Sequence, residues 1–202
     1  MDEVQEIIFK PTLFSDEQRL ILNPEFIEFY KSPKDINPIR FSKLEIDGFR
    51  FGVKWLRGYK LVFGRIYCVD IKSTTETIIK IRLTSVYKIR VKELHKQYNL
   101  IVSAMLQYYA SELVNQYLKL FNYKQPFSIL NVYFNQLGIV LNNKYNIEWN
   151  NIDVRTYTRY VAISSKNKSE IYKTFDYIEE WNTLVLYNVL RLILKSKNLL
   201  KN

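Results

Sequence analysis

Hydrophobic and polar residues alternate along residues 40–86, a pattern typical of strands with one buried face. From Phe49 to Trp55 every second residue is aromatic or aliphatic, while Arg50, Gly52 and Lys54 fill the positions between. Period-two alternation sends one set of side chains to a core and the other to solvent. Two further alternating runs follow over 59–71 and 76–84, and turn residues separate all three runs. We expect an antiparallel meander of three strands.

The pattern changes to helical spacing at residues 92–121. A helix over these residues would be ~45 Å long at ~1.5 Å per residue. The large apolar residues recur there at intervals of three or four: Leu94, Tyr98, Ile101, Met105, Tyr109, Leu113, Tyr117 and Leu120. A second apolar stripe predicts a helix over residues 178–197. Two glutamates stand at the start of that helix and two lysines at its end, as the helix dipole favours.

Residues 126–177 return to runs of strand type. The runs are 127–134, 138–141, 145–149, 154–164 and 170–177, and turns rich in asparagine and lysine separate them. The order strands, helix, strands, helix is a coarse internal repeat. We therefore predict an α+β fold in which antiparallel strand meanders are each closed by a long helix.

Three regions follow from these patterns. Residues 1–39 hold four of the five prolines and only short apolar pieces, so we expect an irregular N-terminal extension packed on the body. Within it, Asn23-Pro24 ahead of an apolar run predicts a short helix over residues 23–30. Residues 40–122 form the first meander with its long helix, and residues 123–202 form the second set of strands with the C-terminal helix.

The second set of strands carries a hydrophobic turn-and-strand motif. Its residues are Phe134, Leu137-Gly138-Ile139 and Ile147-Glu148-Trp149-Asn150-Asn151-Ile152, followed by long strands and a helix region with Trp181. This motif resembles the pleckstrin-homology-like (PH-like) domains of uncharacterised bacterial proteins. The resemblance covers residues 126–197, and residues 40–121 share only the layout. It implies a PH-like fold, as two tandem units or as one composite domain.

Charge is distributed unevenly along the chain. Residues 1–33 carry three basic and seven acidic groups, residues 34–96 carry fifteen and six, and residues 97–202 carry twelve and seven, within a net charge of +10. A single cysteine, Cys68, and a single histidine, His95, exclude a disulfide scaffold and do not suffice for a structural zinc site. No secretory signal and no long apolar segment is visible in this sequence, so we expect a cytoplasmic protein.

The basic residues of the middle region form the first candidate site. Arg50, Lys54, Arg57, Lys60 and Arg65 interleave with aromatic residues along two predicted strands. Such a face could bind an anionic lipid surface, including phosphoinositides, or a nucleic acid. An ordinary solvated face in a lysine-rich chain is the alternative. The alternation itself favours that alternative, because it sends the aromatic side chains to the face opposite the charges.

Asp70, Ile71 and Lys72 form the second candidate site. An acid, then Asp-x-Lys at a strand end, resembles the core of restriction-type nucleases, with Asp47 or Glu45 as the upstream acid. The resemblance implies that Asp47 and Asp70 hold Mg²⁺ while Lys72 supports the attacking water. The interval between Asp47 and Asp70 departs from this pattern, because it needs an additional strand. A solvated strand end is the more common explanation of an Asp-x-Lys sequence.

No specific catalytic constellation stands out beyond this. We therefore expect a non-enzymatic cytoplasmic binding or interaction protein, of the immunity or adaptor type, without cofactor or bound metal. A protein partner is the first expectation. The alternatives are a Mg²⁺-dependent nuclease using Asp47, Asp70 and Lys72, and a module that binds anionic lipid or nucleic acid through residues 50–65.

Overall fold

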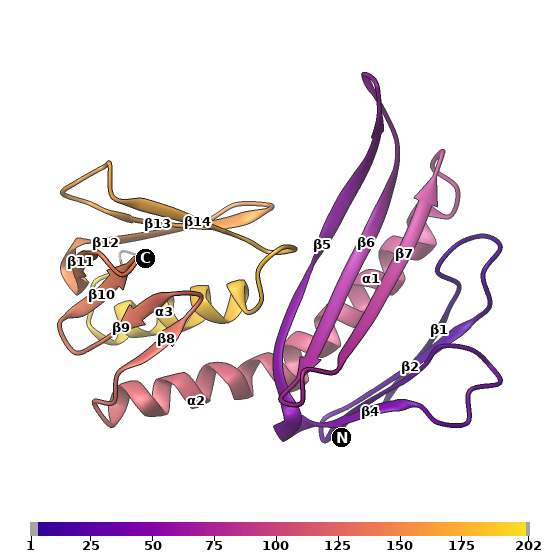
Figure 1. Ribbon diagram of the computed structural model, residues 1–202, viewed down its shortest axis with the longest axis horizontal. Coiled ribbons are helices and arrows are strands. Elements are labelled where there is room, and N and C mark those ends of the chain that lie inside the picture. Colours follow the sequence, from indigo (N-terminus) through magenta and orange to yellow (C-terminus); the bar gives the residue numbers. More distant parts are fainter. Residues whose placement is uncertain (1–3, 201–202) are drawn as a thin grey trace. The chain divides into compact units, whose positions relative to one another are not determined.

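The computed structural model describes residues 4–200 and confirms the α+β class (Figure 1). The first three residues of the expected extension and the last two of the expected C-terminal region lie outside the described residues. The chain forms two compact units, with the boundary between Ser111 and Glu112. This boundary falls within the helical segment, whereas the sequence suggested a division after it.

Unit 1 consists of two antiparallel meanders followed by a helix. The four-stranded sheet has β1 Gln5–Phe9, β2 Gln18–Asn23, β3 Phe26–Tyr30 and β4 Ile39–Ser42. After a 3-10 turn over Lys43–Glu45, the three-stranded sheet has β5 Ile46–Gly58, β6 Leu61–Ser73 and β7 Ile78–Val86. Helix α1 (Val91–Met105) follows, and a π-helical turn over Leu106–Ala110 leads into α2 (Ser111–Asn122).

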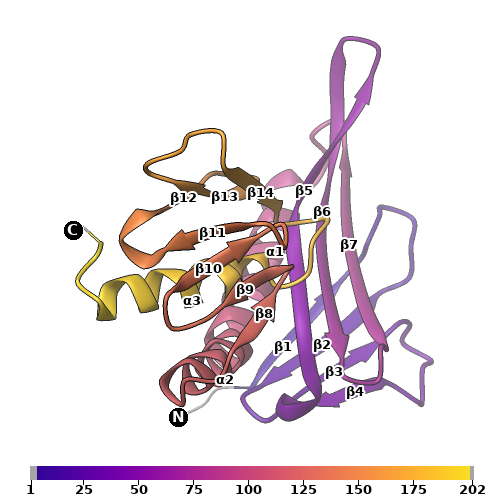
Figure 2. The same ribbon diagram turned by 60° about the vertical axis from the view of Figure 1, so that its left-hand side comes forward.

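Unit 2 repeats this order after α2, as the strand labels of Figure 2 show. Its four-stranded sheet has β8 Phe127–Ile129, β9 Val132–Phe134, β10 Gly138–Leu141 and β11 Tyr145–Glu148. A 3-10 turn over Trp149–Asn151 leads to β12 Ile152–Thr156, β13 Tyr160–Ser165 and β14 Tyr172–Asp176, and α3 spans Thr183–Ser196. The expected repeat is thus present in detail, because each unit has four strands, a 3-10 turn, three strands and a helix.

Alternating burial builds the core of unit 1. Leu20 and Leu22 of β2 are fully buried, as are Ile79 and Ile81 of β7, while the residues between them face outward. Helix α1 contacts β1 and β2 of one sheet and β6 and β7 of the other. Its buried stripe consists of Leu94, Tyr98, Ile101, Ala104 and Met105. One helix face therefore closes the core between two sheets, as the helical spacing predicts.

The prediction for the N-terminal region is wrong. Residues 23–30 form the turn between β2 and β3 and then β3 itself, not a helix. Ile27 and Phe29 are buried with partly exposed residues between them, which is strand alternation over a short run. Asn23 is a turn residue, since its side-chain Oδ1 accepts a hydrogen bond of 2.9 Å from the backbone N–H of Glu25. The expected irregular extension is therefore most of a sheet.

Three further boundaries differ from the sequence pattern. Run 127–134 divides into β8 and β9 around Leu130-Asn131, both at positive φ, and run 154–164 divides into β12 and β13. Helix α3 begins at Thr183 rather than at residue 178. The predicted helix over 92–121 is present, and the π-helical turn within it was not foreseen. Leucine at a left-handed turn position gives no composition signal, which explains the missed β8–β9 turn.

Candidate functional site

A long hairpin of β5 and β6 extends beyond the rest of its sheet (Figure 1). Each of these strands has 13 residues, whereas β7 has 9. Strand β7 pairs with β6 only as far as Gly64, opposite Val86. The residues past that pair continue as two strands alone. We call residues 54–65, which are these residues and the last rows of the three-stranded part, the hairpin tip.

Large apolar and aromatic side chains of the hairpin tip face solvent. Tyr59 is fully exposed and Leu61 is 75% exposed. The other exposed large residues of the tip are Trp55, Val62 and Phe63. Tyr87, 76% exposed, lies beside Phe63 with ring centroids 6.3 Å apart. Single exposed apolar residues are ordinary, but a group of them on one projecting element marks a contact surface.

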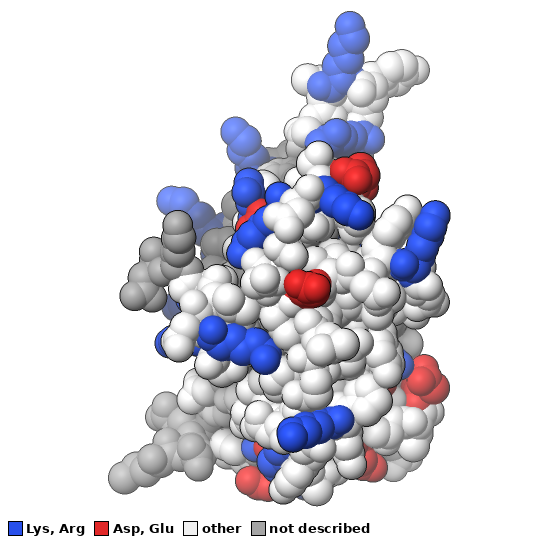
Figure 3. Space-filling view, turned by 90° about the vertical axis from the view of Figure 1, so that its left-hand side faces the viewer, with Lys and Arg blue, Asp and Glu red and all other residues white. Residues whose placement is uncertain are grey.

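Basic side chains surround this apolar group. Lys54, Arg57 and Lys60 are exposed, and Arg65 is partly exposed. Figure 3 shows Lys and Arg at the upper end of the molecule, where Figure 1 places the β5–β6 hairpin. No acidic residue occurs between Gly48 and Val69. Four of the five predicted basic residues therefore belong to the hairpin tip.

The two faces of the hairpin differ from the single basic face that the sequence predicted. Arg65 pairs with Trp55 across the strands and so shares its face, while Lys54 points to the other face. The Arg65 guanidinium carbon lies 4.6 Å from the centroid of the Trp55 ring. A cation held over an aromatic face in this way is attracted by the ring quadrupole. Aromatic and basic groups therefore occur side by side at the tip.

Local backbone geometry builds the end of the hairpin. Leu56 pairs with Gly64 and Arg57 pairs with Val62, so Phe63 is an additional residue in β6. Such a bulge bends a strand and redirects its side chains. Tyr59, in the turn, has φ 49°, a left-handed conformation that costs a bulky residue on the order of 1 kcal/mol. Gly58 pairs with Leu61, so Tyr59 is the first residue of a two-residue hairpin loop, and such loops require a positive φ there.

A cavity of about 290 Å³ lies at the base of the tip. Its lining includes Trp55, Phe63, Arg65, Tyr87 and Lys88. Beside it, β6 and β7 approach closely at Gly64, where a Cβ would lie 2.6 Å from the carbonyl oxygen of Ser85. Only glycine fits that position without displacing a strand. The cavity combines two cations with aromatic walls, which suits an anionic group with an attached apolar part.

Arg50, the fifth predicted basic residue, belongs to a buried ion cluster below the tip. Its Nε donates to Asp70 Oδ2 at 2.9 Å, and Arg82 Nη2 donates to the same oxygen at 3.0 Å. Arg82 Nη1 donates to the other oxygen, Asp70 Oδ1. The Asp70 side chain is only 3% exposed. This cluster links β5, β6 and β7, so Arg50 serves the fold rather than an external ligand.

The same contacts bear on the nuclease alternative. Lys72 Nζ lies 2.9 Å from Asp47 Oδ2 and 3.2 Å from Glu76 Oε1, so Asp47 and Lys72 do come together. Both oxygens of Asp70, however, are bound by guanidinium groups, whose positive charge opposes a cation there. Within residues 4–200 there is no group of three or more His, Cys, Asp or Glu side chains that could hold a metal ion. The geometry therefore favours a structural role for Asp70.

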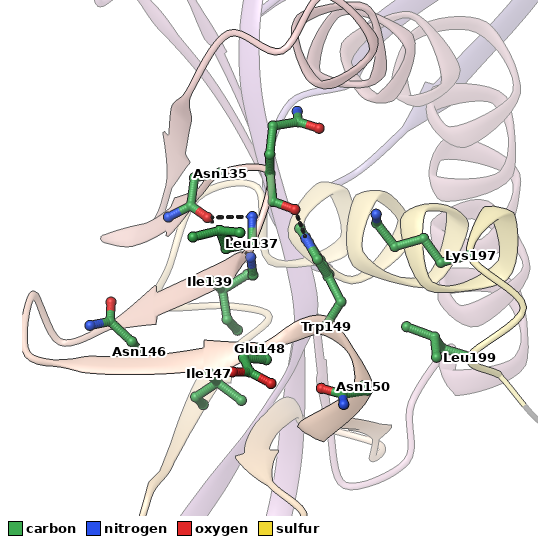
Figure 4. A pocket seen from close by; sticks show the side chains of 12 residues that line it. Asn135, Leu137, Ile139, Asn146, Ile147, Glu148, Trp149, Asn150, Lys197 and Leu199 are labelled. Carbon is green, nitrogen blue, oxygen red and sulfur yellow. Dashed lines mark hydrogen bonds between the residues drawn. The ribbon is translucent and has the colours of Figure 1, made fainter.

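A second cavity, of about 720 Å³, lies in unit 2 where the turn-and-strand motif folds (Figure 4). The indole Nε1 of Trp149 donates to the carbonyl oxygen of Gln136 at 3.1 Å, and Asn135 Oδ1 accepts from the backbone N–H of Gly138 at 3.0 Å. A Cβ at Gly138 would lie 2.0 Å from the carbonyl oxygen of Ile147. The motif therefore consists of turn and packing residues.

Comparison of the chain with protein-family models, with curated proteins and with solved structures found no match. Within the described part of the chain, no helix is both long enough and apolar enough to cross a membrane. The functional argument therefore depends on the geometry alone. Sequence reasoning found the basic residues of the tip but missed its exposed apolar ones, because alternation assigned Trp55 and its neighbours to a core. The unequal strand lengths were the available signal.

Proposed function

We propose that this protein is a non-enzymatic binding protein that attaches to an anionic lipid surface through the hairpin tip. One observation carries the proposal: exposed aromatic and aliphatic side chains project at a hairpin tip that bears basic residues and no acid. Aromatic and aliphatic groups enter the boundary between lipid headgroups and acyl chains. Lysine and arginine beside them are attracted to anionic headgroups, by ~1 kcal/mol for each residue near the surface.

The distribution of chemistry along the tip favours lipid over nucleic acid. Tyr59 offers an aromatic face on which a base could stack, but Leu61 and Val62, past the end of β7, do not. They do have apolar surface that an acyl layer would cover. A protein partner fits less well, because the tip is a narrow two-stranded end and stable protein interfaces bury ~800 Å² per partner. A protein that captures the tip is an outcome of the test below.

The repeated architecture supports the wider proposal of two tandem PH-like units. In both units, strand meanders are closed by a helix, which is the layout that the resemblance implies. An adaptor or immunity role would act through the same exposed tip. Because the two candidate nuclease carboxylates are held by Lys72 and by two arginines, the non-enzymatic proposal is the stronger one.

Vesicle sedimentation tests the proposal. The full chain is mixed with vesicles of phosphatidylcholine alone or with added phosphatidylglycerol, at several salt concentrations. We expect binding only to the anionic vesicles, and we expect it to weaken as salt screens the charges. Replacing Arg57 and Lys60 with glutamine removes about 2 kcal/mol of attraction and weakens binding about 30-fold. The matched control is Lys31→Gln with Lys34→Gln, which changes the net charge equally in the β3–β4 connection, away from the tip (Figure 1).

A second pair of variants tests the apolar part. Leu61→Ser with Val62→Ser should weaken vesicle binding while the free energy of unfolding stays within ~0.5 kcal/mol, since both side chains are exposed. The proposal is wrong if the wild-type chain does not bind anionic vesicles. It is also wrong if the Arg57 and Lys31 variant pairs lose binding equally, or if the tip binds nucleic acid or a soluble protein in preference to vesicles.

A further inference from the structure

Unit 2 has a hairpin at the position that corresponds to the β5–β6 hairpin of unit 1. In each unit the three-stranded sheet follows a 3-10 turn, and its first two strands form a hairpin. In unit 2 these strands are β12 and β13, which pair from Ile152 opposite Ser165 to Thr156 opposite Val161. We call residues 155–160 the second hairpin tip. The internal repeat thus gives an independent reason to compare the chemistry of the two tips.

Two exposed tyrosines form the end of the second hairpin tip. Tyr157 and Tyr160 stack with ring centroids 4.7 Å apart and planes 26° from parallel. The backbone N–H of Tyr157 donates to the carbonyl oxygen of Tyr160 at 2.8 Å, which closes the turn beneath the rings. The two side chains are 45% and 36% exposed. Stacking fixes both rings in one orientation while their outer faces stay in solvent.

Two exposed arginines flank the tyrosine pair. The side chains of Arg155 and Arg159 are 68% and 62% exposed. Each forms an ion pair with a less exposed acid: Arg155 Nε donates to Asp153 Oδ2 at 2.8 Å, and Arg159 Nη2 lies 3.6 Å from Asp176 Oδ2. The acids are only 31% and 28% exposed, and they hold the guanidinium groups in place. The arginine is therefore the more exposed member of each ion pair.

We propose that the second hairpin tip is a second contact of this chain for anionic lipid. This inference rests on the proposed function of the first tip. The shared chemistry is an aromatic group beside exposed guanidinium groups at the end of a hairpin, which matches the interface between anionic headgroups and acyl chains. Tyrosine suits that boundary because its ring is apolar and its hydroxyl stays hydrated.

Two contacts that engage one vesicle together raise the apparent affinity of the chain above that of either contact alone. The gain disappears when one contact is removed, although the other still binds. Loss of the second tip should therefore weaken vesicle binding without abolishing it. Loss of the first tip, with its larger apolar group and four cations, should weaken binding further.

The test compares two pairs of tyrosine substitutions in the full chain. Tyr157→Ser with Tyr160→Ser removes the rings of the second tip. The control, Tyr133→Ser with Tyr172→Ser, removes two exposed tyrosines of the same unit that lie outside the tip. Using vesicles of phosphatidylcholine with phosphatidylglycerol, we expect about tenfold weaker binding for the first pair and an unchanged affinity for the control. Tyr157→Phe with Tyr160→Phe keeps the rings and should bind within about twofold of the wild type.

Failure of this inference and failure of the proposed function give different results. If the serine pair at the second tip binds as tightly as the wild type while the first-tip variants lose binding, the second contact is wrong and the proposed function stands. If the wild type does not bind anionic vesicles, both are wrong. If the Tyr157→Ser, Tyr160→Ser variant unfolds, the Arg159→Gln variant tests the second contact instead. A weaker dependence of vesicle binding on salt in this variant supports the second contact, and an unchanged dependence contradicts it.

Discussion

Replacing Asp70 with asparagine separates the structural role of this residue from a catalytic one. Asparagine keeps the shape of the side chain and one acceptor oxygen, but it removes the charge that holds Arg50 and Arg82. If Asp70 is the counter-ion of a buried cluster, its neutralisation leaves two guanidinium groups without compensation and destabilises unit 1. If Asp70 were a metal ligand, removing one of several clustered negative charges would leave the metal-free protein as stable or more stable.

The size of the loss follows from the exposure of the partners. Breaking a fully buried ion pair costs ~3–5 kcal/mol, and a surface pair contributes ~0.2–1 kcal/mol. The Asp70 side chain is 3% exposed, but Arg50 and Arg82 are 24% and 38% exposed, so water screens part of the uncompensated charge. We therefore expect Asp70→Asn to lower the free energy of unfolding by about 2–3 kcal/mol, between these limits.

Urea unfolding followed by circular dichroism measures this loss, since the midpoint falls with unchanged slope when stability alone changes. Asp47→Asn is the matched control, because Asp47 is 49% exposed and pairs with Lys72 at the surface; its loss should stay below ~1 kcal/mol. Arg82→Gln should also destabilise, and its double variant with Asp70→Asn should lose less than the two single losses added. Two results together would refute this reasoning. In the absence of divalent cations Asp70→Asn would be as stable as the wild type, and Mg²⁺ would stabilise the wild type but not the variant.

Two further predictions concern buried tyrosines. Tyr109→Phe should lower the free energy of unfolding by ~1–2 kcal/mol, because the Tyr109 hydroxyl donates to the carbonyl oxygen of Phe26 at 2.8 Å and accepts from the N–H of Asn23 at 3.3 Å. Tyr67→Phe should leave stability unchanged or raise it, because within residues 4–200 the buried Tyr67 hydroxyl has no hydrogen-bond partner. Thermal unfolding of the two variants measures the difference. Burial also raises the pKa of Tyr98 and of Tyr109, so the folded state keeps protons that the unfolded state releases. The free energy of unfolding should therefore fall above about pH 10 by ~1.4 kcal/mol per pH unit for each tyrosine. Urea titrations at several pH values that gave wild type and Tyr98→Phe the same fall in stability with pH would contradict this.

Long runs with a strong period were predictable from the sequence. The helical spacing from Leu94 onward meets the burial that it predicts, because many residues share one period. The alternation from Phe49 to Trp55 predicts strand β5 but not its burial, since Phe49 is buried and Trp55 is exposed. The N-terminal strands were not predictable in this way. Each has only five or six residues before β4, and Asn23-Pro24 fits a helix start and a turn equally well. Only the pairing of β2 with β3 distinguishes the turn from the helix start.

The candidate site was half predictable for a related reason. Charge identifies Arg57 and Lys60 directly, since no acid is close to them in sequence. Trp55 lies opposite Arg65, within the three-stranded part, and is still 44% exposed, which is a tertiary fact that alternation cannot supply. Arg50 shows the opposite error. Its charge placed it in the basic group, while its cross-strand neighbour Asp70 pairs with it in the structure.

The position of the ion cluster explains how an exposed hairpin can present a fixed surface. A two-stranded hairpin alone is at best marginally stable in water, so the end of β5 and β6 depends on the three-stranded part below it. Arg50, Asp70 and Arg82 each come from a different strand of that part, and their contacts hold all three strands together near the base of the tip. Asp70→Asn should therefore weaken vesicle binding only through loss of folded protein. Restoring the folded fraction, by lowering the urea concentration or the temperature, should restore binding, whereas Arg57→Gln with Lys60→Gln should stay defective in fully folded protein. If a fully folded Asp70→Asn variant still failed to bind vesicles, the Asp70 carboxylate would have a direct role in lipid binding. That result would contradict the conclusion that the ion cluster stabilises the sheet while the hairpin tip binds.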